Sequence, residues 1–138
     1  MVKDIPFSDI NIGDKASMEK TVTERDVNLF AEITGDVNPV HLDEEYAQQT
    51  VFKTRVAHGM LTASFISAVL GTTLPGANTI YVSQELRFKA AVKIGETVTA
   101  IVEVLEKADR MRLITLKTTV VNQSGAIVVE GTAKVIKR

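Results

Sequence analysis

The sequence predicts an α+β domain in which a curved antiparallel β-sheet wraps around a central buried α-helix. One stretch near the middle of the chain, Met60 to Leu70, is apolar at nearly every position apart from small hydroxyl residues. This pattern is typical of a helix enclosed by other elements. After Asn78 the apolar residues recur at every second position in runs separated by short turns. Such runs indicate sequential antiparallel strands.

Length and composition indicate one globular domain, which we expect to span residues 1–138. A chain of this size buries roughly 70% of the surface that its unfolded form exposes. Apolar residues make up 45% and charged residues 24%, far from the composition of a disordered chain. The net charge is -1, and no basic patch with interleaved aromatic residues stands out. We therefore expect no nucleic-acid partner.

The absence of cysteine excludes disulfides and thiolate chemistry. The first residues carry Asp4 and Asp9 and no apolar run, so they do not resemble a signal peptide. The apolar stretch from Met60 to Leu70 is too short to span a bilayer. We therefore expect a cytoplasmic protein with no membrane partner.

The first part of the chain predicts one strand and two short helices. A weakly alternating run from Ala16 to Val22 favours a strand. The segment Thr23 to Asp26 resembles a capping box, which predicts that a helix begins there, and Gly35 is suited to end it. Asp43 can cap a second short helix over Glu44 to Ala47.

The central helix is predicted from about His58 to Leu70, with Gly71 ending it. A long strand from Asn78 to Ala90 follows, with apolar residues on one face and polar residues on the other. Three more strands complete the sheet: Val98 to Val104, Met111 to Val121 and Ala126 to Ile136.

A polar segment from Thr34 to Asp43 carries the best candidates for chemistry: Asp36, Asn38 and His41. Fully extended, Asp36 and His41 would be roughly 17 Å apart at about 3.4 Å per residue. They can act together only if the turn at Asn38 and Pro39 brings them back. A carboxylate and an imidazole that hold one water molecule can perform general acid–base catalysis, and the near-neutral reference pKa of histidine suits proton transfer in either direction.

Structural roles compete with the catalytic interpretation. Asp36 can be a turn residue, Asn38 can act in turn formation and Asp43 can be a helix cap. His41 can be a loop histidine whose ring is satisfied by hydrogen bonds. A metal site made of His41, Asp43 and His58 has no recognisable ligand spacing, so we expect no metal.

With these elements in place, the sequence resembles the MaoC-like hydratases of the hot-dog superfamily, in particular the (R)-specific enoyl-CoA hydratases. The family's loop pattern matches Phe30 followed by Thr34-Gly35-Asp36-Val37-Asn38-Pro39-Val40-His41-Leu42-Asp43. Further matches cover nearly the whole chain in order: Ala57-His58-Gly59-Met60-Leu61, Leu74-Pro75-Gly76 and Phe88-Lys89.

The resemblance implies a hot-dog fold and the reversible syn addition of water to a trans-2-enoyl-CoA, giving the (R)-3-hydroxyacyl-CoA, with no cofactor. We expect short acyl groups similar to crotonyl-CoA. It also implies a homodimer, or a dimer of dimers, in which two sheets join side by side and the active sites lie between subunits. The sequence leaves open which pathway of fatty acid metabolism the reaction serves: polyester (polyhydroxyalkanoate) precursor supply, fermentation or fatty-acid degradation.

The resemblance also assigns roles to single residues. Asp36 and His41 are catalytic, and the backbone N–H of Gly59 stabilises the thioester oxygen. At the first turn of a helix this N–H has no intrahelical partner; a glycine kept for close packing is the alternative. Ser67 matches a position whose hydroxyl bonds the catalytic aspartate, although it can equally bond back to its own helix.

Other residues are expected to bind or support the substrate: Asn38, Met60 and Leu70. The CoA phosphates require cations, for which the candidates are Lys53, Arg55, Arg87 and Lys89. Ordinary surface charge is the alternative explanation for these four.

Two other functions compete with hydration. A hot-dog acyl-CoA thioesterase would share the fold and the ligand, but many such enzymes place an acidic residue on or beside the central helix. The stretch from Val56 to Leu70 contains no Asp or Glu, which favours the hydratase. A non-catalytic acyl-CoA-binding module would not need both Asp36 and His41.

Overall fold

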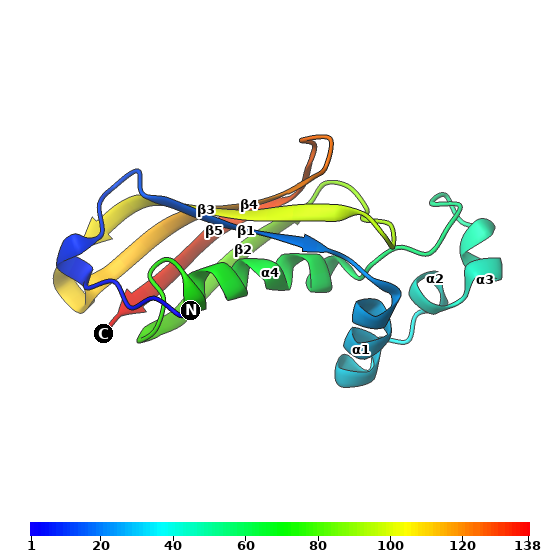
Figure 1. Cartoon of the computed structure of the whole chain (residues 1–138), viewed down its shortest axis with the longest axis horizontal. Coiled ribbons are helices and arrows are strands. Elements are labelled where there is room, and N and C mark those ends of the chain that lie inside the picture. The colour runs from blue at the N-terminus through cyan, green and yellow to red at the C-terminus, as the bar shows by residue number, and fades with distance from the viewer.

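The computed structural model describes residues 1–138 as a five-stranded antiparallel sheet with one long helix along its face (Figure 1). Three short helices extend beyond one end of the sheet, away from the two chain termini (Figure 1). The strands are β1 Lys15–Thr21, β2 Thr79–Phe88, β3 Thr97–Ala108, β4 Leu113–Asn122 and β5 Ile127–Lys137. The helices are α1 Glu24–Thr34, α2 Pro39–Leu42, α3 Glu44–Gln48 and α4 Gly59–Thr72, with 3₁₀ turns η1 Phe7–Asp9 and η2 Arg110–Arg112.

The sheet has the order β1-β3-β4-β5-β2. The three consecutive strands β3, β4 and β5 pair with their neighbours, as short turns between alternating runs predict. Alternate residues of β3 are buried, as the period-2 pattern requires: Val98, Ala100, Val102 and Val104. Strand β2 pairs only with β5, so its other edge has no partner within the chain.

Helix α4 packs its apolar side against the sheet, and this contact forms the centre of the core. Ile66, Val69 and Leu70 are at most 1% exposed and belong to a cluster of 23 buried residues that takes in all the central strands. On its other side, Met60 and Ser67 are exposed. Within the chain, α4 is therefore covered on one side and open on the other. None of the helices has the combination of length and hydrophobicity that a membrane span requires.

Helix α1 begins at the predicted capping box. The hydroxyl of Thr23 accepts from the backbone N–H of Asp26 at 3.1 Å, and the Asp26 carboxylate accepts from the backbone N–H of Thr23 at 2.9 Å. Gly35 ends the helix with φ 81°, a left-handed conformation that glycine adopts without strain. The chain therefore leaves α1 at a defined angle into the polar segment.

The structure differs from the sequence prediction at a few boundaries. The polar segment is not a loop throughout, because α2 begins at Pro39. Strand β2 ends at Phe88 rather than Ala90. Strand β4 begins at Leu113 rather than Met111, because Met111 and Arg112 have positive φ values of 62° and 52° that no β-strand accommodates.

Candidate active site

The turn at Asn38 and Pro39 folds the polar segment back on itself. The Asn38 side chain accepts from the backbone N–H of Val40 at 3.2 Å, and Pro39 occupies the first helical position, where a missing N–H has no cost. One carboxylate oxygen of Asp36 and one ring nitrogen of each of His41 and His58 consequently lie within 4.8 Å of one another. The turn therefore brings Asp36 and His41 close together, as the catalytic interpretation of the sequence requires.

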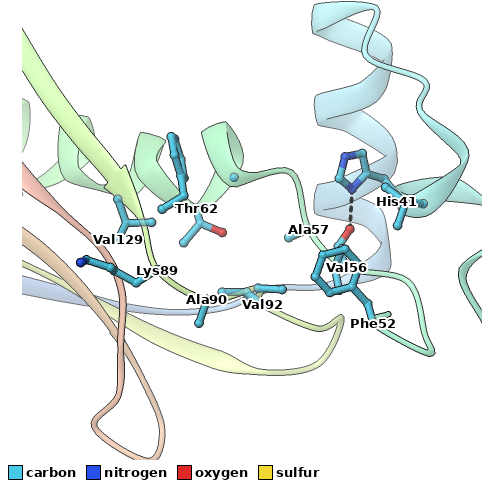
Figure 2. A pocket seen from close by; sticks show the side chains of 13 residues that line it. His41, Phe52, Val56, Ala57, Thr62, Lys89, Ala90, Val92 and Val129 are labelled. Carbon is cyan, nitrogen blue, oxygen red and sulfur yellow. Dashed lines mark hydrogen bonds between the residues drawn. The ribbon is translucent and has the colours of Figure 1, made fainter. Parts of the chain in front are cut away.

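A hydrogen bond to the backbone sets the orientation of the His41 ring. Its Nδ1 lies 2.7 Å from the carbonyl oxygen of Val56 (Figure 2). Because a carbonyl oxygen only accepts, Nδ1 carries the proton in this contact. In the neutral ring, Nε2 then keeps a free lone pair that can take a proton from water and return it.

His58 lies beneath this ring and is only 2% exposed. The two imidazoles are stacked with their centroids 3.9 Å apart, and the His58 Nε2 lies 2.9 Å from the backbone oxygen of Asp36. Burial is the main cause that lowers the pKa of His58, and the positive charge of His41 lowers it further, against the raising effect of Asp36. His58 is therefore held in its neutral form near neutral pH.

A cavity of about 360 Å³ opens beside this group, between the start of α4 and the end of β2. His41 and Phe52 lie on one side of it, and Lys89 and Val129 lie on the other (Figure 2). Nine of its thirteen lining residues are hydrophobic, so the cavity suits an apolar ligand that ends near a polar group.

Gly59 lines the same cavity as His41. It is the first residue of α4, and its backbone N–H makes no hydrogen bond within the chain. This unpaired donor lies at the positive end of the helix dipole. A Cβ atom here would lie 2.9 Å from the Phe88 ring, so a side chain would press on a wall of the cavity.

Asp36 is exposed and does not line the cavity. Its carboxylate accepts from the backbone N–H of Asn38 at 3.2 Å, so it also has the turn role that competes with catalysis. Asp43 acts as the N-cap of α3, accepting from the backbone N–H of Tyr46 at 3.1 Å. It is not part of the polar group around His41.

The predicted supporting residues on α4 lie elsewhere. Ser67 and Met60 line a second cavity of about 390 Å³ between α4 and β2, and Ser67 makes no hydrogen bond to Asp36 of its own chain. Leu70 is 1% exposed in the core and lines neither cavity, because its side of the helix faces the sheet. Within the single chain, neither Ser67 nor Leu70 therefore contacts the group formed by Asp36, His41 and His58.

The four cations that were candidates for binding the CoA phosphates differ in whether their charged groups are already engaged by other residues. Arg55 is fully engaged inside the helical segment: its guanidinium donates to the backbone oxygen of His41 at 2.7 Å, to Glu24 at 2.8 Å and to Asn28 at 3.0 Å. It is a structural clamp on α1 and α2, and the expectation that it could bind phosphate does not fit this role. The sequence offered no signal for it, because its partners are 14 to 31 residues away.

The other three cations are exposed. Lys89 lines the first cavity and lies 3.4 Å from Glu130. Arg87 lies on β2, with its guanidinium 3.9 Å from Glu85 of the same strand. Of the exposed cations, Lys89 alone lines the cavity that also takes in His41 and Gly59, so it is best placed to meet an anionic part of a ligand.

The nitrogen and oxygen atoms of Asp36, His41 and His58 are also a possible metal-binding set. The two rings are stacked with an interplanar angle of 28°, so they lie face to face. A metal ion needs lone pairs that converge on one point. The arrangement therefore fits proton transfer better than metal binding.

An antiparallel sheet packed on one long helix, with an Asp–His pair beside the N-terminus of that helix, defines a hot-dog domain of the hydratase class. Sequence comparison agrees: the model of the MaoC like domain matches residues 9–126. The chain belongs to the MaoC-like family.

Several similar proteins are named (R)-specific hydratases. The chain is 54% identical to an (R)-specific enoyl-CoA hydratase of Rhodospirillum rubrum, over 94% of this chain and 90% of that protein. It is 41% identical to an (R)-specific enoyl-CoA hydratase of Aeromonas caviae, over 91% of this chain and 94% of that protein. An R-hydratase of Pseudomonas aeruginosa, solved without ligand, superposes with a TM-score of 0.94 at 46% identity, over 99% of this chain and 87% of that one.

Proposed function

We propose that this protein is an (R)-specific enoyl-CoA hydratase, a hydro-lyase that also runs in reverse as a 3-hydroxyacyl-CoA dehydratase. One observation carries the proposal most directly. The Asp36 carboxylate and the His41 ring come within 4.8 Å, and the unpaired N–H of Gly59 lines the same cavity as His41. Hydration of an enoyl thioester needs these three groups.

In the proposed reaction, Asp36 and His41 hold one water molecule over C3 of the enoyl group. His41 Nε2 removes a proton as the water oxygen bonds to C3, and Asp36 orients the water by accepting its second hydrogen. The proton then goes to C2 on the same face, so that both atoms of the double bond gain one substituent. The sum is one water added and one C=C bond lost.

Negative charge builds up on the thioester oxygen during this step. The N–H of Gly59 can donate to that oxygen, and the α4 dipole adds to the stabilisation. Donors of this kind contribute on the order of 10²- to 10³-fold in rate. The absence of a side chain at Gly59 leaves room for the thioester between the helix end and Phe88.

The reaction needs neither electrons nor a Lewis acid, since a base, an oriented water and a hydrogen-bond donor meet each of its demands. We propose that the CoA thioester reacts without a cofactor. Two of the residues that line the cavity, Thr62 and Val129, are at most 2% exposed, and a cavity of about 360 Å³ walled by such buried side chains favours a short acyl group such as crotonyl. Lys89 is the proposed contact for the CoA moiety.

We also propose that the protein acts as a homodimer joined through the free edge of β2. That edge has no strand partner, and apolar side chains beside it are exposed: Met60 58%, Ile80 44%, Tyr81 41% and Val82 51%. An unpaired strand with an apolar border is a template for pairing with another chain. In such a dimer the open side of α4 would be covered, and Ser67 would be free to bond Asp36 of the partner subunit.

The thioesterase alternative is disfavoured because α4 offers no acidic side chain to direct water at the thioester carbon. A binding module is disfavoured because apolar binding alone would not need a ring nitrogen left free beside a carboxylate. Both alternatives remain outcomes of the same assay.

The test adds crotonyl-CoA and follows the loss of enone absorbance together with free thiol release in one cuvette. The proposal expects absorbance loss without thiol and a product of R configuration. Asp36→Asn and His41→Gln should each lower kcat by about 10³-fold, within the 10²- to 10⁴-fold range that one proton-transfer group contributes. Thiol release would establish a thioesterase, and acyl-CoA binding with no turnover by the wild type would establish a binding module.

A further inference from the structure

We propose that His58 is a positioning residue, which ties the Asp36 loop, the His41 ring and the start of α4 into one rigid unit. This inference rests on the proposed hydratase function and deepens it. His58 does not line the cavity, so it acts through its neighbours and not on the substrate.

The three parts of the proposed site come from separate segments, and His58 contacts each of them. Its Nε2 lies 2.9 Å from the backbone oxygen of Asp36, across 22 residues of chain. Its ring stacks on His41 with centroids 3.9 Å apart. It is also the N-cap residue of α4, directly before Gly59. A displacement of any one part therefore has to move the other two or break a contact of this one side chain.

The hydrogen bonds also define which nitrogen of His58 carries the proton. The Asp36 backbone oxygen only accepts, so Nε2 donates and carries a proton. The other nitrogen, Nδ1, is buried and has no hydrogen-bond partner. A second proton on Nδ1 would place an unpaired charge in the interior, stacked against His41 and close to the carboxylate of Asp36, the two titratable groups that face it.

A packing role alone explains the buried His58 ring less well than a positioning role does. An apolar side chain would fill the same buried space beside Phe30 without burying an unpartnered nitrogen, and buried polar atoms without partners are rare. The polar ring is accounted for by its donation to Asp36 and by its flat contact with His41. Only a planar donor performs both tasks.

Two variants separate positioning from packing. His58→Gln keeps a planar group with an N–H donor, whereas His58→Leu keeps the buried volume and loses the donor. Because a misplacement of about 1 Å at a reacting centre costs on the order of 10²-fold in rate, we expect His58→Leu to lose about 100-fold in kcat with little change in KM. His58→Gln should recover most of that loss and remain within about tenfold of the wild type.

A control variant accounts for lost stability. Val69→Ala removes a fully buried side chain from α4 that touches neither cavity, so it should lower the melting temperature without lowering kcat of the folded protein. If His58→Leu loses no more kcat than Val69→Ala at equal loss of stability, or if His58→Gln loses as much as His58→Leu, the positioning role is overturned.

A second readout does not depend on activity. The chain has two histidines, so long-range ¹H–¹⁵N spectra of the wild type and of His58→Gln assign both rings. Because burial lowers the pKa of His58 below 6.5, we expect His58 to be a neutral ring protonated at Nε2 at pH 7 to 8. A His58 protonated at Nδ1 alone, or charged across this range, would overturn the inference even in an active enzyme. An inactive wild type with the expected tautomer would instead refute the hydratase function and leave the structural unit standing.

Discussion

Replacing Arg55 by Met should loosen the segment that carries the catalytic pair. The Arg55 side chain is 13% exposed and donates to the backbone oxygen of His41, to Glu24 and to Asn28. A hydrogen bond from a charged donor is worth about 1.5–3 kcal/mol when shielded from solvent. The ion pair with Glu24 contributes less than about 1 kcal/mol, because Glu24 is 66% exposed.

These contacts together predict a loss of about 3 kcal/mol in the free energy of unfolding for Arg55→Met. For a chain of 138 residues this corresponds to a fall of roughly 10 °C in melting temperature. Because the backbone of His41 loses its anchor, kcat should also fall by about tenfold or more.

The assay is urea unfolding followed by circular dichroism, at one fixed protein concentration because association would shift the midpoint, with crotonyl-CoA hydration measured on the same samples. The matched control is Arg87→Met. Its guanidinium is 70% exposed and 3.9 Å from Glu85, so its removal should change stability by less than about 0.5 kcal/mol. An Arg55→Met variant as stable as this control would refute the clamp.

Three further perturbations follow from the structure. Gly59→Ala should keep the fold but lower kcat by about 10²-fold, because the new Cβ pushes on the Phe88 ring where the thioester approaches the N–H; normal kinetics with crotonyl-CoA would remove Gly59 from the mechanism. Since the pKa of His58 is lowered from 6.5 in the folded state, the unfolded chain binds the proton first. The wild type should therefore lose stability as the pH falls below about 6.5, more steeply than His58→Gln in parallel urea titrations; equal slopes would contradict the buried neutral ring. Val82→Lys should convert the proposed dimer to a monomer in light scattering, because the charge lies beside the free edge of β2; an unchanged mass would place the interface elsewhere.

Sequence patterns predicted correctly those helix starts and strands that are determined by contacts between residues close together in the chain. The capping box at Thr23 and Asp26 involves residues three positions apart, and the Asp43 cap of α3 spans the same distance. The burial alternation of β3 follows directly from its sequence period. The short helix α2 was missed although its signal was present, since an Asn followed by Pro is typical of a helix start as well as of a turn.

Non-local contacts explain what the sequence did not predict. Arg55 looked like a free surface cation, but its partner Glu24 is 31 residues away, and no periodicity connects them. His58 was considered only as a metal ligand, because its bond to Asp36 crosses 22 residues. The resemblance to the family placed Asp36, His41 and Gly59 in one site, whereas nothing in the pattern of α4 indicated that Leu70 faces the sheet and Ser67 faces away from it.

The segment between β1 and α4 leaves the sheet, carries both ionisable groups of the proposed reaction, and returns at Gly59. Its internal bonds, such as those of Arg55, close mostly within the segment itself, while eight of the thirteen residues that line the cavity come from α4 and the later part of the chain. Evolution or a protein engineer could thus alter the length of the accepted chain by changing those lining residues and leave the proton-transfer apparatus intact. Exchanging residues 23–58 between relatives should transfer the proton-transfer groups together with the part of the cavity wall that Val40, Phe52, Val56 and Ala57 form.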